Sequence, residues 1–215
     1  MEFDAWEPFY EEILKDFVFS REKDEAVAVE LDKLLGGNRI PESSLRQIIR
    51  GKEVTVAGNG PNVAHEIGGA RGVLITADEA TSVALKKGLL PSILVTDLDG
   101  TVSDQVKANV EGAIAVIHGH GDNGPAVRQW APRFSGATMA TTQSRPFGGL
   151  RNFGGFTDGD RAAFLADHFG AARIHLVGFD FEHPNAKDLD RRTKQRKLDW
   201  AYILLGSLHR DELEL

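Results

Sequence analysis

Two aspartates directly follow a short apolar run in the stretch Ile93–Gly100, which reads Ile-Leu-Val-Thr-Asp-Leu-Asp-Gly. The run is rich in β-branched residues and is typical of a strand that is covered on both faces. Asp97 and Asp99 lie two positions apart, so in an extended chain their carboxylates point the same way. Such a pair repels unless a cation or basic group lies between the charges, and Mg²⁺ uses hard oxygen ligands of this kind when it also holds substrate phosphates. The alternative is a pair of solvated loop aspartates that cap the next helix.

A second polar string, residues 118–123, reads His-Gly-His-Gly-Asp-Asn. His118, His120 and Asp122 alternate, so they could face one side of an extended chain together. The spacing is similar to the His-x-His-x-Asp-His ligand string of metallo-β-lactamase-type hydrolases, which makes a di-metal hydrolase an alternative. However, Asn123 replaces the last histidine, and that fold places its string after antiparallel strands. A magnesium site is therefore favoured, although the histidines can equally be backbone anchors and Asp122 a helix N-cap.

A glycine-rich turn follows the first predicted strand and consists of Gly58, Asn59, Gly60, Pro61 and Asn62. Two glycines let the backbone approach an anion closely, and the next helix would offer N–H groups and the positive end of its dipole. The turn is not a dinucleotide fingerprint, because Val63 stands where the third glycine is expected. It is not a P-loop either, since the Lys-Ser/Thr pair is missing.

Further charged residues stand at the ends of predicted elements. Asp78 follows the second predicted strand, where a helix N-cap is the favoured role and a substrate contact the alternative. The glycine-dense stretch 145–161 predicts a mobile loop over a site. It ends in a helix whose first turn carries Asp158 and Asp160, followed by Arg161. Acidic residues at a helix start are common caps, so either aspartate can be structural.

The stretch 188–197 is the one strong positive cluster in the sequence, and it contains Arg191, Arg192, Lys194, Arg196 and Lys197. A basic run is usually a solvated face. Here it would balance a polyphosphate that the carboxylates meet only through a metal ion.

Composition narrows the class of protein. The chain has 215 residues, 41% apolar and 27% charged, and it carries a formal net charge of −7. These values indicate an ordinary α/β globule, and an acidic chain is not expected to coat nucleic acid. No stretch reaches the about 20 apolar residues of a membrane span, and neither a signal peptide nor a cysteine is present. We therefore expect a cytoplasmic protein without a membrane or nucleic-acid partner.

The elements that must position these residues change in type at residue 50. Helical spacing of apolar residues predicts a helical extension over residues 1–50, and 51–215 is expected to form an α/β catalytic domain. Predicted strands cover residues 53–57, 72–77, 92–96, 112–117, 136–141 and 173–178. Predicted helices between them cover 80–87, 103–110, 123–130 and 159–168. This alternation predicts a doubly wound, mostly parallel sheet whose ligands bind beyond the carboxyl ends of the strands.

Five motifs in this order carry a family resemblance: Gly58-x-Gly60-Pro61, Thr96-Asp97-Leu98-Asp99-Gly100, His118-x-His120-Gly121-Asp122-Asn123, Gly155-Phe156-Thr157-Asp158-Gly159-Asp160-Arg161 and Lys194-x-x-Lys197-Leu198. Together they resemble the archaeal 6-hydroxymethyl-7,8-dihydropterin diphosphokinases of the MptE-like group. The core of that group is similar to the catalytic domain of thiamin pyrophosphokinase. The resemblance covers residues 50–205, and it departs from the family where Asn62-Val63 replaces an expected Ser-Leu.

The resemblance implies Mg²⁺-dependent transfer of a diphosphate from ATP to the pterin hydroxymethyl group, with release of AMP, in tetrahydromethanopterin or folate biosynthesis. We expect the metal to be held by Asp97, Asp99 and Asp122, and Asp158 or Asp160 to complete the site or orient the acceptor. We expect ATP contacts from Gly58, Asn59, Gly60, Pro61, Asn62, Arg191, Lys194, Arg196 and Lys197. Expected substrate contacts are Asp78, His118, His120, Asn123 and Arg161.

Two other functions stay open at this point. A glycan-modifying or nucleotide-sugar-using enzyme would share the core and the aspartate pair, and it would ignore a pterin. A non-catalytic nucleotide-binding module would bind ATP without producing AMP. The helices of residues 1–50 also leave a homodimer open.

Overall fold

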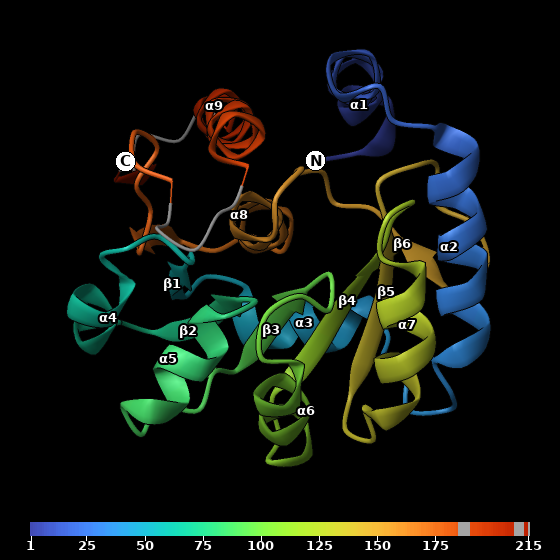
Figure 1. The fold of residues 1–215 in the computed structure, drawn as a ribbon. Coiled ribbons are helices and arrows are strands. Elements are labelled where there is room, and N and C mark those ends of the chain that lie inside the picture. Colours follow the sequence, from blue (N-terminus) through green and yellow to red (C-terminus); the bar gives the residue numbers. More distant parts are fainter. Residues whose placement is uncertain (185–189, 209–212, 215) are drawn as a thin grey trace.

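The computed structural model describes residues 1–184, 190–208 and 213–214, and it centres on one parallel sheet (Figure 1). In the described residues the strands are β1 (Glu53–Ala57), β2 (Val73–Ala77), β3 (Ile93–Thr96), β4 (Ile114–Gly119), β5 (Thr138–Thr142), β6 (Leu150–Arg151), β7 (Arg173–Val177) and β8 (Leu213–Glu214). Their order is β6-β5-β4-β3-β2-β1-β7-β8, and each neighbouring pair is parallel. The predicted α/β class with a parallel sheet is confirmed.

Helices cover both faces of the sheet. They are α1 (Phe3–Phe17), α2 (Arg21–Leu34), α3 (Glu42–Ile49), α4 (Val63–Glu66), α5 (Ala80–Lys86), α6 (Val102–Val110), α7 (Gly124–Trp130), α8 (Asp158–His168) and α9 (Arg191–Gly206), with 3₁₀ turns at Ile67–Gly69 and Ala131–Arg133. One face packs against α3 and α8, and the other against α2 and α4–α7. Helices α1 and α9 lie on the outer side of α8 (Figure 1). Within the described residues, no helix combines the length and apolarity needed to cross a bilayer.

Side-chain alternation along the strands explains this layering. Val73 and Ile75 of β2 join the hydrophobic cluster under α3 and α8, whereas Leu74 joins the cluster under α4 and α5. In β3, Ile93 points to the first face and Leu94 to the second. Because both faces are buried, these strands are continuous apolar runs, as expected for a parallel sheet.

Residues 1–50 are helical, as their periodicity predicts, and they share the core of the sheet. Leu45 and Ile49 of α3 belong to the same cluster as the strands and α8, and Leu31 of α2 packs in the cluster that contains β4. Trp6 and Tyr10 of α1 pack with α8 and α9. The three helices therefore form layers of one continuous packing arrangement with the residues that follow them.

Three elements in the described residues differ from the expectation, and one of them is β8, which pairs with β7 where no strand was predicted. Strand β6 lies inside the stretch expected to be a mobile loop, since its backbone pairs with β5. The basic stretch begins a helix, α9, whose buried residues Ala201, Leu204 and Leu205 come only in its last turns. The first half of α9 is polar, so it lacks the periodic apolar residues from which a helix is normally predicted.

The strand order reverses between β1 and β7, because the chain crosses from β6 at one end of the sheet to the far side of β1. Ligands in doubly wound folds bind at such a reversal, outside the carboxyl ends of the strands. The loops after β1, β2, β3 and β7 meet there, beside the first turn of α8.

The shared core predicts a single unfolding transition. Leu31→Ala empties a fully buried position on α2 and is expected to lower the free energy of unfolding by about 2–5 kcal/mol. Urea unfolding followed by circular dichroism measures this. Val110→Ala, at a position 61% exposed, is the matched control and should change stability by less than about 0.5 kcal/mol. A separate early transition of residues 1–50, or an unchanged midpoint in Leu31→Ala, would contradict the shared core.

Candidate active site

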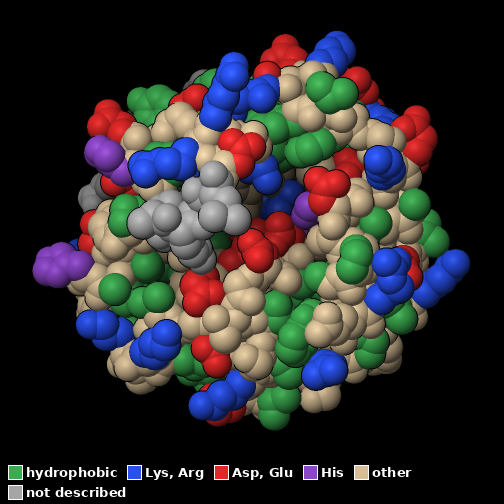
Figure 2. All heavy atoms as spheres, viewed as in Figure 1, with side chains coloured by type: hydrophobic (Ala, Val, Ile, Leu, Met, Phe, Trp, Pro, Cys, Tyr) green, Lys and Arg blue, Asp and Glu red, His purple; other side chains and the backbone are tan. Residues whose placement is uncertain are grey.

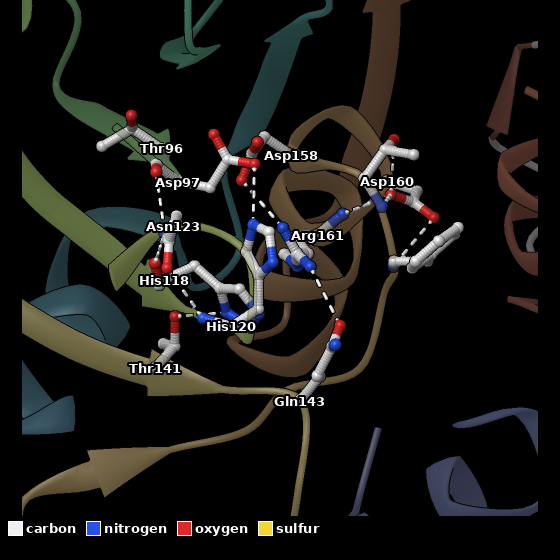
Figure 3. A network of polar contacts seen from close by, with 12 residues as sticks. Thr96, Asp97, His118, His120, Asn123, Thr141, Gln143, Asp158, Asp160 and Arg161 are labelled. Atoms are coloured by element: carbon white, nitrogen blue, oxygen red, sulfur yellow. Dashed lines mark hydrogen bonds and ion pairs between the residues drawn. The ribbon is translucent and has the colours of Figure 1, made fainter. Parts of the chain in front are cut away.

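Three aspartates from three different elements meet at the carboxyl ends of β2 and β3, on one side of the reversal point of the sheet. Asp78 follows β2, Asp97 follows β3, and Asp158 is the first residue of α8. One carboxylate oxygen of each lies within 4.8 Å of the other two. Figure 3 shows Asp97 and Asp158 facing each other across the sheet edge. We refer to Asp78, Asp97 and Asp158 as the aspartate triad.

Burial and mutual repulsion disturb the ionisation of the triad. Burial, followed by the charges of Asp158 and Asp97, raises the pKa of Asp78 well above its ordinary value. Burial and the charge of Asp97 also raise the pKa of Asp158. For Asp97, burial alone would raise the pKa, but the hydrogen bond from His120 and nearby positive charges lower it. A cation between the three groups would remove the reason for the raised pKa values.

The donor atoms of the triad fit a divalent cation. Within the described residues, Asp78 Oδ1 and Asp97 Oδ1 are buried without a hydrogen-bond partner. Unpaired buried carboxylate oxygens are costly unless they have a ligand. Hard carboxylate oxygens are the ligands that Mg²⁺ prefers.

Two polar side chains hold the triad in place. Arg161 Nη1 lies 3.1 Å from Asp158 Oδ1, and its Nη2 donates to Gln143 Oε1 at 3.3 Å. His120 Nε2 lies 3.3 Å from Asp97 Oδ2. Because His120 Nδ1 accepts the N–H of Asp122, its proton is assigned to Nε2, which donates to Asp97. The contacts of Arg161 with Asp158 and Gln143, and that of His120 with Asp97, are drawn in Figure 3.

The predicted metal ligands Asp99 and Asp122 lie outside the triad. Leu98 has a φ of 69°, so the chain is not extended between Asp97 and Asp99, and the expected common direction of the two carboxylates is lost. Asp99 lines the mouth of the cleft and accepts the N–H of Gly100. Asp122 is exposed and does not line the cleft. Of the three residues expected to bind metal, the structure brings only Asp97 to the triad.

Asp160 has the structural role that the sequence left open. It is fully buried, and its carboxylate accepts the N–H groups of Phe156, Thr157 and Arg161 in the capping box of α8. Burial raises its pKa to about 6, so it is ionised at neutral pH. Asp160 thus caps the helix that carries Asp158.

His118 and Asn123 also act inside the fold. His118 is buried, and its Nδ1 lies 3.0 Å from Thr141 Oγ1. Burial and the charge of Arg161 lower its pKa well below the ordinary value, so it is neutral. Asn123 Nδ2 donates to the carbonyls of Asp97 and His118, which ties the ends of β3 and β4 together. Neither residue lines the cleft, so the string 118–123 does not converge as a di-metal hydrolase would require.

The glycines of the first turn allow the loop after β1 to pack closely against the backbone at the end of β7. The N–H of Gly58 donates to Val177 O, and that of Gly60 donates to Gly178 O at 2.6 Å. A Cβ at Gly60 would lie 2.6 Å from Gly178 O, so a larger residue does not fit. These two N–H groups are therefore already used, which differs from the expected phosphate cradle. Gly58, Asn59 and Gly60 still line the cleft, whereas Pro61 and Asn62 do not.

The basic residues divide between the cleft and the scaffold. Lys194 and Lys197 of α9 line the cleft, and the charge of Lys197 contributes to the lowered pKa of Asp97. Arg196 instead pairs with Asp16 of α1 at 2.6 Å. Arg191 is exposed and outside the cleft lining. Residues 188–189 of the basic stretch lie outside the described residues.

The resulting cleft has a volume of about 210 Å³ and mixed walls. Figure 2 shows acidic and basic side chains facing the same hollow. Four phenylalanines, Phe19, Phe156, Phe179 and Phe181, add apolar surface to it. Such flat apolar walls beside charged groups suit a planar ring that carries phosphate.

Sequence reasoning missed two residues that support the site, Gln143 and Asp24. Asp24 accepts Gln143 Nε2 at 2.8 Å. A signal for Asp24 exists in the sequence, because it shares the buried stripe of α2 with Ala28 and Leu31 at helical spacing. A carboxylate on an apolar stripe needs buried donors. For Gln143 we find no comparable signal.

The crossing at Gly60 gives a prediction. Gly60→Ala is expected to destabilise the fold by about 2 kcal/mol or more, because the new Cβ would overlap the Gly178 carbonyl. Gly68→Ala is the control, since nothing lies within 4 Å of the Cβ position there. Thermal unfolding compares the two variants, and equal midpoints would contradict the close crossing.

Known proteins match this chain over most of its length. A family model described as 6-hydroxymethylpterin diphosphokinase MptE-like matches residues 31–186, which include all three aspartates of the triad. Curated relatives named 6-hydroxymethyl-7,8-dihydropterin pyrophosphokinase match nearly the whole chain. The relative from Methanothermobacter thermautotrophicus is 39% identical and covers 98% of this chain and 97% of its own. The relative from Methanocaldococcus jannaschii is 34% identical, with 100% and 98% covered.

A third relative of the same name, from Pyrococcus furiosus, is 43% identical over 84% of this chain and 79% of its own. Among solved structures, the Maf glycosyltransferase from Magnetospirillum magneticum is similar over 76% of this chain and 29% of its own, with 19% identity and a TM-score of 0.44. That degree of likeness has no bearing on function. On the family model and the curated relatives, this chain belongs to the 6-hydroxymethylpterin diphosphokinase MptE-like family.

Proposed function

We propose that this chain transfers a diphosphate from ATP to the hydroxymethyl group of 6-hydroxymethyl-7,8-dihydropterin, with Mg²⁺ as cofactor, in tetrahydromethanopterin or folate biosynthesis. The observation that carries the proposal is the aspartate triad with its two unpaired oxygens, beside two lysines in an aromatic-walled cleft. The names of the curated relatives support the acceptor. We propose that residues 1–50 and the catalytic domain of residues 51–215 form one folded unit. The cytoplasmic location stays a prediction.

In the proposed reaction, the acceptor hydroxyl oxygen forms a bond to the β-phosphorus of ATP. The bond between that phosphorus and the oxygen bridging to the α-phosphorus breaks, and AMP leaves with the electron pair. The hydroxyl proton passes to a base, for which the cleft lining offers three carboxylates outside the triad, those of Glu79, Asp99 and Asp180. Catalysis of this kind depends mainly on positioning and on stabilising negative charge.

The residues of the cleft divide this work. Asp78, Asp97 and Asp158 would hold the metal ion, which supplies positive charge to the phosphate oxygens when bound. Lys194 and Lys197 add positive charge to the cleft from α9. His120 and Arg161 keep two triad carboxylates oriented. The phenylalanines offer flat surface to the pterin or adenine ring.

The direct test follows AMP and the pterin diphosphate by chromatography. Purified protein with ATP, Mg²⁺ and 6-hydroxymethyl-7,8-dihydropterin should form both products in equal amounts, and EDTA should stop the reaction. ATP binding without AMP would indicate a nucleotide-binding module. Turnover only with a nucleotide-sugar donor would favour a glycan-modifying enzyme.

A pair of aspartate variants separates the metal site of the structure from the one expected from sequence. Asp78→Asn should lower kcat by at least about 100-fold, because it removes a ligand oxygen. Its thermal stability should be unchanged or higher, since it also removes a repelling charge. Asp122→Asn should keep a near-normal rate, because this side chain is exposed and outside the cleft. The reverse ranking would remove Asp78 from the metal site.

A second pair tests the lysine wall. Lys197→Gln is expected to raise the KM for ATP and lower kcat by about 10-fold or more, because a charge near the phosphates is lost. Arg191→Gln removes the same charge from the exposed start of α9 and should have little effect. Steady-state kinetics at fixed ionic strength distinguishes them. Equal effects would mean that only the overall charge of α9 matters.

A further inference from the structure

Asp24 lies on α2, outside the cleft, and its buried carboxylate accepts hydrogen bonds from three donors. The residue is 3% exposed. Its Oδ1 accepts the N–H of Gly121 at 2.7 Å, and its Oδ2 accepts Gln143 Nε2 at 2.8 Å and the Tyr10 hydroxyl at 2.6 Å. The three partners are a backbone N–H, an amide NH₂ and a hydroxyl, and each of them donates to an oxygen of Asp24.

The first connection runs through Gln143 to Asp158. Because Asp24 accepts from Gln143 Nε2, the amide oxygen of Gln143 must face the other way, toward Arg161. A guanidinium offers donors only, so a neutral amide in this orientation satisfies both neighbours. Arg161 then reaches Asp158 at 3.1 Å. Trp6 Nε1 also donates to the backbone carbonyl of Gln143 at 2.8 Å, which holds its main chain in place.

The second connection runs through Gly121 to Asp97. Gly121 follows His120, whose Nε2 lies 3.3 Å from Asp97 Oδ2. The loop is pressed directly against the second helix, since a Cβ at Gly121 would lie 2.9 Å from Lys23 Cβ and 3.2 Å from Asp24 Oδ1. Removal of the Asp24 acceptor would therefore take away the bond that ties the loop carrying His120 to α2, and the bonds of Asn123 would remain.

We propose that Asp24 is a positioning residue for the metal site, acting on Asp158 through Gln143 and Arg161 and on Asp97 through the Gly121–His120 loop. It rests on the proposed function, because it assumes that the triad binds a divalent cation. Residues that orient metal ligands from outside the coordination sphere typically contribute 10- to 100-fold in metal affinity.

Tyr10 supplies the matched control. Burial and its hydrogen bond to Asp24 raise the pKa of the Tyr10 hydroxyl, so it stays protonated and donates. Tyr10→Phe removes one donor from Asp24 and leaves the Gln143 and Gly121 bonds in place. It should lower thermal stability without changing metal affinity.

The experiment titrates Mn²⁺ into wild-type protein, Asp24→Asn and Tyr10→Phe by isothermal calorimetry, without substrates. Asp24→Asn places an amide where Gln143 and Gly121 both need an acceptor, so one connection breaks. We expect about 10-fold or weaker Mn²⁺ binding in this variant. Its apparent activation constant for Mg²⁺ should rise more than kcat falls at saturating metal. Tyr10→Phe should bind Mn²⁺ as wild-type protein does.

The outcomes separate the two proposals. Wild-type affinity in a folded Asp24→Asn variant would overturn the positioning role alone and leave Asp24 as a stabilising residue. No Mn²⁺ binding by wild-type protein would overturn the metal site and this inference together. If Asp24→Asn does not fold, Gln143→Leu cuts only the first connection. Unchanged Mn²⁺ affinity in that variant would also overturn the inference.

Discussion

The mutual repulsion of three carboxylates is the interaction on which the site depends. Asp78, Asp97 and Asp158 bring one oxygen each within 4.8 Å of the others in a partly buried setting, where screening by water is weak. No single element could hold them there, because each comes from a different strand end or helix. The fold supplies the opposing forces: the buried core fixes the strand ends, and Arg161 and His120 bind two of the carboxylates.

The amino-terminal helices belong to this balance of forces. α1 and α2 are far in sequence from the residues of the triad, yet Trp6 and Asp24 bond to the loops that carry Gln143 and Gly121. Tyr10 supports them by donating to Asp24. Arg196 of α9 closes the same layer by pairing with Asp16 of α1. The helices therefore stabilise the wall of the cleft as well as the core. In a small α/β protein, an outer layer of this kind can set the precision of a site without touching a substrate.

The crossing of the loops after β1 and β7 sets the other wall. Gly60 and Gly178 approach so closely that the N–H of Gly60 donates to the carbonyl of Gly178, and the ring of Phe179 lies against Gly58. The glycines therefore serve the packing of one loop on another. Their N–H groups are bound within the protein, so charge for a polyphosphate comes from the lysines of α9 instead.

The sequence by itself determined the class of fold and single members of the site. Apolar runs of β3 and its neighbours predicted buried parallel strands, because such runs have few other stable uses, and Asp97, Lys194 and Lys197 could be named from their neighbours. Only the tertiary structure decided which residues lie next to them in space. Asp158 or Asp160 was expected to complete the site, and strand order with the docking of α8 brought Asp158 and also Asp78 to Asp97, which local spacing does not encode. Asp99 was separated from Asp97 by the positive φ of Leu98, a choice imposed by the burial of its side chain and the bond from its N–H to Thr96 Oγ1. Spacing thus identified groups that can do chemistry, and long-range packing selected which of them meet.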